Sequence, residues 1–231
     1  MTKPEGTVYV VDDDPGVRES MEDLLSSHGF AVTTFSSAAD YKAAVASADG
    51  PACLVLDIDL PDMSGLELQS ELAGHQHPPI VFITGYGDIP SSVRAIKAGA
   101  VDFLPKPFTS KQLLTAIDAA LLQHREMHSQ LVELASLRVR YASLTPRERE
   151  VLPLVVRGRL NKQAAAELGI REVTLQIHRA HIMRKMDADS LPDLVRMSMK
   201  LGIASTASEG QSTSQLRSSA AGEGRSGTDP T

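Results

Sequence analysis

Four short apolar segments in the first half of the chain each end beside a reactive side chain, and this pattern constrains the fold more than any other feature. In chain order, the side chains at their ends are Asp12 and Asp13, Asp57, Thr84 and Lys106. Continuous apolar runs of this length are typical of strands buried in a parallel sheet. Open α/β sheets bind ligands at the carboxyl ends of their strands. We therefore expect these five side chains to meet at one edge of a parallel sheet.

The chemistry of this set indicates phosphoryl transfer. Three carboxylates repel one another unless a cation lies among them, and Mg²⁺ prefers oxygen ligands such as carboxylates and phosphate oxygens. We predict that Asp57 is the nucleophile that accepts a phosphoryl group, while the other carboxylates hold Mg²⁺. Lys106 would supply a fixed positive charge, and the Thr84 hydroxyl would donate a hydrogen bond to the acyl phosphate.

Five motifs within residues 6–122 follow one another in a recognisable order. They are Val10-Val11-Asp12-Asp13-Asp14, Leu56-Asp57, Leu60-Pro61-Asp62-Met63-Ser64-Gly65, Thr84-Gly85 and Lys106-Pro107-Phe108. On these motifs, the segment resembles a response-regulator receiver domain. The resemblance implies an α/β fold of the flavodoxin-like (βα)5 type, with a doubly wound parallel sheet. It also implies a cis peptide bond before Pro107, which X-Pro chemistry permits.

The same resemblance assigns roles to individual residues. It implies that Asp13, Asp57 and the backbone carbonyl of Asp59 hold Mg²⁺, with Asp12 acting through water. It also implies a switch in which Thr84 moves toward the phosphoryl group while Phe103 turns inward. Two positions depart from the commonest pattern of the family. Gly85 replaces the usual alanine, and Asp59 places an extra acid two residues beyond the phosphoacceptor.

Length and composition favour two domains in a soluble protein. A chain of 231 residues that is 42% hydrophobic can bury one core of about 120 residues and another of about 60. No apolar run approaches the ~20 residues that span a bilayer, so we expect a cytoplasmic protein without a membrane partner. The single cysteine, Cys53, lies in an apolar run, which favours a buried inert thiol and no disulfide.

Charge differs between the two halves of the chain. Residues 1–125 carry 8 Lys and Arg against 17 Asp and Glu, a net charge of −9, whereas residues 144–203 carry 11 against 7, a net charge of +4. An acidic half suits a Mg²⁺ site. A basic half suits a polyanion, although +4 by itself is weak support for nucleic acid.

A long helix is predicted between the halves. No proline occurs between Thr109 and Thr145, and Thr109-Ser110-Lys111-Gln112 is a capping box that predicts a helix from Ser110 to about Tyr141. Its first half should cover the receiver sheet. Residues 123–143 then form a linker helix, which is either a short coiled coil between two copies of the chain or a frayed spacer.

Residues 144–203 have the outline of a helix-turn-helix. A second capping box, Thr145-Pro146-Arg147-Glu148, starts a helix that ends at Gly158. A short helix over residues 161–168 follows, then a tight turn at Gly169-Ile170 and a polar helix over residues 172–186. The sequence thus predicts an all-α domain, followed by a tail over residues 204–231 whose Ser, Gly, Thr and Ala content favours disorder.

Several motifs of this half match one family in register. They are Leu144-Thr145-Pro146-Arg147-Glu148-Arg149-Glu150-Val151-Leu152, Gly158, Asn161-Lys162, Leu168-Gly169-Ile170, Val173-Thr174, His178-Arg179 and Ile182-Met183-Arg184-Lys185-Met186. On these motifs, the segment resembles the LuxR-type helix-turn-helix of NarL/FixJ response regulators. The resemblance implies base contacts by Gln176, Ile177 and Ala180. The full set of DNA-contacting residues that we expect is Asn161, Lys162, Thr174, Gln176, Ile177, Arg179, Ala180, Arg184 and Lys185.

Within this set, Lys162, Thr174, Arg184 and Lys185 are expected to hold phosphates. The family often has lysine at position 176 and serine at position 171. Gln176 favours adenine as a bidentate partner, and Arg171 leaves the helix that follows it without a polar-oxygen cap.

The two resemblances together predict a transcriptional regulator, not an enzyme, that binds DNA when phosphorylated. A cognate sensor histidine kinase would phosphorylate Asp57, and a homodimer would then bind paired half-sites on double-stranded promoter DNA, with RNA polymerase as a further candidate partner. One alternative is a phosphoregulated adaptor whose helical domain binds a protein. A Mg²⁺-dependent phosphohydrolase that uses Asp57 is disfavoured, because no second catalytic acid or substrate pocket is evident in the sequence.

Overall fold

The computed structural model describes residues 6–44, 50–85 and 89–203. The chain divides into two compact units, Met1–Gln130 and Leu131–Thr231. The division falls inside a single helix, α5 (Ser110–Ala142). The tail that was expected to be disordered, residues 204–231, lies outside the described residues.

The first unit is built on a five-stranded parallel sheet. Its strands are β1 (Thr7–Val11), β2 (Ala31–Phe35), β3 (Ala52–Asp57), β4 (Ile80–Thr84) and β5 (Asp102–Pro105). They lie in the order β2-β1-β3-β4-β5, and each neighbouring pair is parallel. This is the doubly wound order of the flavodoxin-like fold, so the predicted fold class is confirmed. The strand order reverses between β1 and β3, where such sheets bind their ligands.

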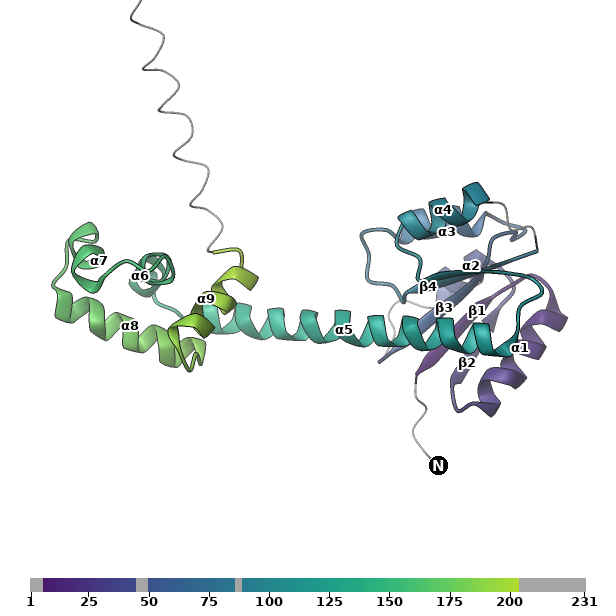
Figure 1. Ribbon diagram of the computed structural model, residues 1–231, viewed down its shortest axis with the longest axis horizontal. Helices are drawn as coiled ribbons and strands as arrows, with labels where there is room; N and C mark the ends of the chain where they lie inside the picture. Colours follow the sequence, from purple (N-terminus) through teal and green to yellow (C-terminus); the bar gives the residue numbers. More distant parts are fainter. Residues whose placement is uncertain (1–5, 45–49, 86–88, 204–231) are drawn as a thin grey trace, which may run out of the picture. The chain divides into compact units, whose positions relative to one another are not determined.

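Helices cover both faces of this sheet. Figure 1 shows α1 (Pro15–Ser27) and the first half of α5 on one face, and α2 (Ala38–Ala44), α3 (Gly65–Leu72) and α4 (Ile89–Lys97) on the other. Successive residues of β3 point to opposite faces: Cys53 packs in the core beside α1 and α5, and Leu54 packs in the other core. Cys53 is fully buried, as expected, and this burial raises the pKa of its thiol.

The start of α5 follows the predicted capping box. The Thr109 backbone N–H donates to Gln112 Oε1 at 2.9 Å, and the Gln112 N–H donates back to Thr109 Oγ1 at 3.3 Å. Leu113, Ile117 and Leu121 are then buried against the sheet. The first half of the helix therefore covers the sheet as the sequence predicted.

The second unit is helical. Its helices within the described residues are the end of α5, α6 (Pro146–Val156), α7 (Asn161–Glu167), α8 (Glu172–Met186) and α9 (Leu191–Lys200). Thr145 and Glu148 form the predicted capping box of α6, and Gly158 has a positive φ of 75° just after that helix ends. The three predicted helices are confirmed. The fourth, α9, was not anticipated; it begins at a Ser190 cap with a proline in its first turn.

The last residues of α5 pack against the other helices of the second unit. Leu137 is only 4% exposed. Arg140 donates to the backbone oxygen of Met186 at 3.1 Å, and Lys200 of α9 pairs with Glu133 at 2.5 Å. The helix is continuous over the segment that was expected to be a coiled coil or a frayed spacer, and its end is held by α8 and α9. Pairing of two copies along this helix stays a prediction.

Among the residues described, no helix combines the length and apolar character needed to cross a membrane.

One histidine fastens α5 to the sheet of the first unit. The backbone N–H of Ala52, where β3 begins, donates to His124 Nδ1 at 3.0 Å. Burial lowers the pKa of His124, and the nearby imidazoles of His128 and His77 lower it further, while a hydrogen bond with the Gly50 backbone opposes them. The ring therefore acts as a neutral acceptor in the folded chain.

This contact predicts a pH effect on stability. The folded pKa of His124 lies below the unfolded value, so the unfolded chain binds more protons and the free energy of unfolding falls as the pH drops below about 6.5. His124→Gln keeps an acceptor but does not titrate, so it should lose less stability between pH 7 and pH 5 than the wild type. Denaturant unfolding at both pH values measures this. The exposed His75→Gln serves as the control, and equal losses in all three proteins would contradict the assignment.

Candidate functional site

Three carboxylates meet at the carboxyl edge of the sheet, where the strand order reverses. Asp12 and Asp13 directly follow β1, and Asp57 is the last residue of β3, which pairs with β1. One carboxylate oxygen from each of the three residues lies within 4.8 Å of the other two. Asp12 and Asp57 are buried, whereas Asp13 is exposed. The expectation that these side chains meet is therefore correct.

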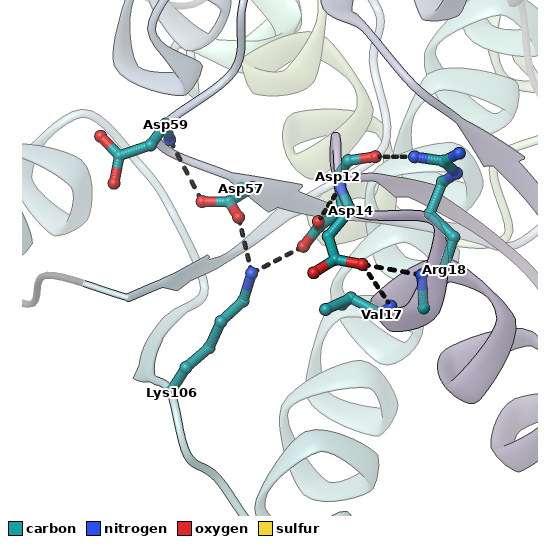
Figure 2. A network of polar contacts seen from close by, with 8 residues as sticks. Asp12, Asp14, Val17, Arg18, Asp57, Asp59 and Lys106 are labelled. Atoms are coloured by element: carbon teal, nitrogen blue, oxygen red, sulfur yellow. Dashed lines mark hydrogen bonds and ion pairs between the residues drawn. The ribbon is translucent and has the colours of Figure 1, made fainter.

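A single ammonium group bridges two of these carboxylates. Lys106 Nζ donates to Asp12 Oδ2 at 2.7 Å and to Asp57 Oδ2 at 2.6 Å, as Figure 2 shows. Lys106 directly follows β5, the strand next to β4, and its backbone N–H donates to the Thr84 carbonyl at 2.7 Å. The peptide bond to Pro107 is cis, as the sequence resemblance implied. The Lys106 side chain therefore reaches past β4, from the end of the edge strand β5 to the ends of β3 and β1.

The cluster remains short of positive charge even with Lys106 in place. Burial raises the pKa of Asp12, and the Asp57 charge adds to this, although hydrogen bonds from Lys106 and Asp14 work against it. Burial also disfavours the Lys106 ammonium, but its bonds to Asp12 and Asp57 outweigh that effect and raise its pKa. Three carboxylates and one ammonium leave a formal charge of −2. An oxygen-rich site with this charge is suited to a divalent cation.

The loop after β3 folds back onto Asp57. The Asp59 N–H donates to Asp57 Oδ1 at 3.1 Å, and a β-carbon at Gly65 would lie only 2.4 Å from the Asp57 carbonyl oxygen. Position 65 therefore needs glycine. Figure 2 shows the Asp59 carboxylate pointing away from the Asp57 and Lys106 pair. The predicted role of the Asp59 backbone carbonyl in holding a metal stays a prediction.

The two predicted switch residues lie on the strands nearest Lys106. Thr84 ends β4 and is fully buried. Phe103 lies on β5, is half-buried, and has its ring 6.5 Å from that of Phe82. Their proposed movement on phosphorylation stays a prediction.

Two supporting residues were not anticipated from the sequence. Asp14 caps α1 by accepting from the Gly16 N–H at 2.7 Å, and its own N–H donates to Asp12 Oδ1 at 2.9 Å. Arg18 donates to the Asp12 backbone carbonyl at 2.7 Å. An acid directly before Pro15 is a helix-start pattern that could have revealed the Asp14 cap. Nothing local to Arg18 indicates its contact, because the contact depends on how α1 leaves the sheet.

A second candidate surface lies on α8. Leu175, Ile182 and Met186 are buried on one side of this helix. Residues at helical spacing on the other side are exposed, namely Val173, Gln176, Ile177, Ala180 and Arg184. The structure therefore exposes the three residues expected to contact bases. Arg171 precedes the helix without a side-chain cap, as predicted.

Two of the expected DNA-contacting cations already have partners within the protein. Arg179 Nη1 donates to Asn161 Oδ1 at 3.2 Å, and Lys185 Nζ donates to Glu148 Oε2 at 2.7 Å. Burial would raise the pKa of Glu148, but the Lys185 ammonium and hydrogen bonds from Thr145 hold it below its usual value. The Lys185 and Glu148 pair ties α8 to α6. Lys162 and Arg184 are exposed and Thr174 is half-buried, and all phosphate contacts stay predictions.

Comparison with known families agrees with this geometry. Residues 8–118 match the response regulator receiver domain, and residues 142–198 match the bacterial regulatory proteins of the luxR family. Nodulation protein W of Bradyrhizobium diazoefficiens is 48% identical over 203 residues, which cover 87% of this chain and 89% of that protein. The response regulator protein TodT of Pseudomonas putida is 47% identical over 204 residues, which cover 87% of this chain and 88% of TodT.

Solved structures give the same result. The response regulator StyR superposes with a TM-score of 0.73 at 47% identity, covering 84% of this chain and 98% of StyR. Full-length FixJ from B. japonicum superposes with a TM-score of 0.53 at 39% identity, covering 87% of this chain and 98% of FixJ. The chain therefore belongs to the response regulators that join a receiver domain to a LuxR-type DNA-binding domain. Its relatives in that class include the response regulator protein TodT and the transcriptional regulatory protein FixJ, and the chain is a transcriptional regulator.

The charge deficit of the cluster predicts stabilisation by a divalent cation. A ligand that binds only the folded chain stabilises it by about 2.7 kcal/mol at a hundred times its Kd, so Mg²⁺ should raise the Tm of the wild type. Asp13→Asn should lose most of that rise, because it removes one of the three carboxylates that would hold the cation. Asp13 is exposed, so its replacement should leave the fold intact. The exposed Glu22→Gln removes the same charge from α1 and should keep the rise. An equal Mg²⁺ effect in both variants would show that Asp13 is not a ligand.

Proposed function

We propose that a sensor histidine kinase phosphorylates Asp57 in the cytoplasm, and that this modification increases binding of promoter DNA by the second unit. The proposal rests mainly on the Lys106 ammonium, which bonds to Asp12 and Asp57 at 2.7 and 2.6 Å within a cluster of three carboxylates. This arrangement lies at the ligand-binding edge of a doubly wound sheet. Membership of the response-regulator family supports it independently.

Asp12, Asp13 and Asp57 are suited to Mg²⁺, since all three offer carboxylate oxygens close together. When bound, Mg²⁺ would neutralise charge on the incoming phosphoryl group. Lys106 keeps its proton, because the carboxylates beside it raise its pKa. It therefore provides a permanent positive charge opposite the phosphoryl oxygens.

The transfer itself requires little from the protein beyond positioning. A carboxylate oxygen of Asp57 forms a bond to phosphorus while the bond from phosphorus to the donor's imidazole nitrogen breaks. The departing imidazole takes up a proton from solvent. The Thr84 hydroxyl then donates to an oxygen of the new acyl phosphate, and Phe103 turns inward as Thr84 moves.

Phosphorylation would reach the DNA through dimer formation. One small helix-turn-helix makes few contacts, and two recognition helices on half-sites about 34 Å apart multiply them. In this proposal α8 enters the major groove, while the exposed Lys162 and Arg184 contact phosphates. RNA polymerase is the candidate partner of the promoter-bound dimer.

The phosphoacceptor can be tested directly. With Mg²⁺ and a small-molecule phosphodonor, the wild type should gain one phosphoryl group in intact-mass measurements, and Asp57→Asn should gain none. Asp59→Asn is the matched control, because this carboxylate lies two residues away and points elsewhere, and it should still be labelled. Labelling of Asp57→Asn, or labelling that EDTA leaves unchanged, would refute the assignment.

Two neighbouring cations of α8 should behave differently when replaced. Arg184→Ala should lower affinity for preferred and scrambled DNA alike and reduce the slope of log affinity against log salt by roughly one per monomer, with an unchanged Tm. Lys185→Ala should lower the Tm, because the buried Glu148 carboxylate loses the ammonium that pairs with it at 2.7 Å. Binding isotherms at several salt concentrations and thermal unfolding measure both effects. An unchanged salt slope in Arg184→Ala would remove this arginine from the phosphate contacts.

A further inference from the structure

The exposed side of α8 is unusually apolar for a surface that would meet DNA. Val173 is 66% exposed and Ile177 is 50% exposed. Together with Gln176 and Ala180 they form an exposed stripe, and this stripe carries no charge over the first two and a half turns of α8. Large aliphatic side chains left in water on one helix face indicate a surface that a partner covers.

The charged residues near the stripe lie off its centre or have partners. Arg179 is bonded to Asn161 and Lys185 to Glu148. Both of these cations, together with Glu172, lie roughly a quarter turn or more around the helix from the centre of the stripe. Arg184 is on the stripe, but in the last turn of α8. Bases are usually contacted from the N-terminal part of a recognition helix.

Positive charge nevertheless lies at both ends of α8. Arg171 directly precedes α8, Arg184 lies in its last turn, and both are exposed. An uncharged strip between two cations complements a duplex, whose phosphates flank the base edges of the major groove. Double-stranded DNA is therefore the occupant that this surface fits.

The chemistry of base edges then indicates which base pairs are contacted. Guanine is bound in the major groove by arginine or lysine, and cytosine by an acidic residue. Adenine pairs with glutamine or asparagine in two hydrogen bonds, and the thymine methyl group takes apolar contacts. Over its first two and a half turns, where bases are usually contacted, the stripe offers the partners of adenine and thymine and lacks those of guanine and cytosine. We infer that the core of each half-site consists of A·T pairs, with adenine bound by Gln176 and thymine methyl groups packed on Ile177 and Val173.

This inference rests on the proposed function, namely DNA binding through α8, and specifies the base pairs that this helix selects. It depends on the glutamine at position 176, since a lysine there would favour guanine instead.

Selection from a random duplex library with the phosphorylated full-length chain provides the first test. The expected result is a paired half-site whose core positions are A·T. A half-site with a G·C core would overturn the inference while leaving the proposed function intact. Failure to enrich any sequence would instead count against DNA binding through α8, and the inference would fall with it.

Uracil in place of thymine provides the second test, because it removes only the methyl group. On the selected site, replacing the core thymines one at a time should weaken binding by about threefold to fivefold where a methyl group is buried. Ile177→Ala should be insensitive to one of these replacements. The control is Met199→Ala, which truncates another exposed apolar residue, on α9 instead of α8, and should keep the full sensitivity. If uracil has no effect at any core position of the wild type, the methyl contacts do not exist.

The third test changes the selected base. Gln176→Lys substitutes an exposed residue, so folding should be unaffected, and repeated selection should convert one core A·T pair to G·C. An unchanged preference in this variant would show that Gln176 does not select the base.

Discussion

The bridge that Lys106 makes between Asp12 and Asp57 is the interaction on which the candidate site depends. Two buried carboxylates at adjacent strand ends repel each other, and an ammonium within 2.7 Å of both offsets that repulsion. The bridge requires β5 to end where its next residue can reach across β4 to the reversal point between β1 and β3. This geometry depends on the strand order, on the loop that returns to Asp57 at Gly65, and on the cap that Asp14 provides for α1.

The Lys106 bridge leaves the carboxylate cluster short of positive charge, and this deficit suits the site to the proposed phosphoryl transfer. A residual formal charge of −2 favours a divalent cation, and a cation in turn makes the site receptive to a phosphoryl group. In the second unit, the Glu148 carboxylate of α6 and the Lys185 ammonium of α8 form an ion pair that holds the two helices together. The LuxR-family match makes DNA a better-supported partner for this unit than the protein partner of the adaptor alternative.

Features encoded locally were predicted well from the sequence. Strand ends, both capping boxes and the extent of α5 and α8 follow from residues within a few positions of one another. The contacts that were missed join distant residues: Arg140 with Met186, 46 positions apart, and Lys185 with Glu148, 37 positions apart. Such pairs depend on how helices pack, which periodicity does not specify. The helix α9 was overlooked although Ser190 and Pro192 mark its start.

Phosphorylation of Asp57 is proposed to control DNA binding by changing the charge of the carboxylate cluster. The most direct measurement compares the affinity of the full-length chain for its selected duplex before and after treatment with Mg²⁺ and a small phosphodonor, in the wild type and in Asp57→Asn. The account predicts a rise in affinity for the wild type and none for the variant. Equal affinities in all four samples, with the wild type shown to be phosphorylated, would contradict it.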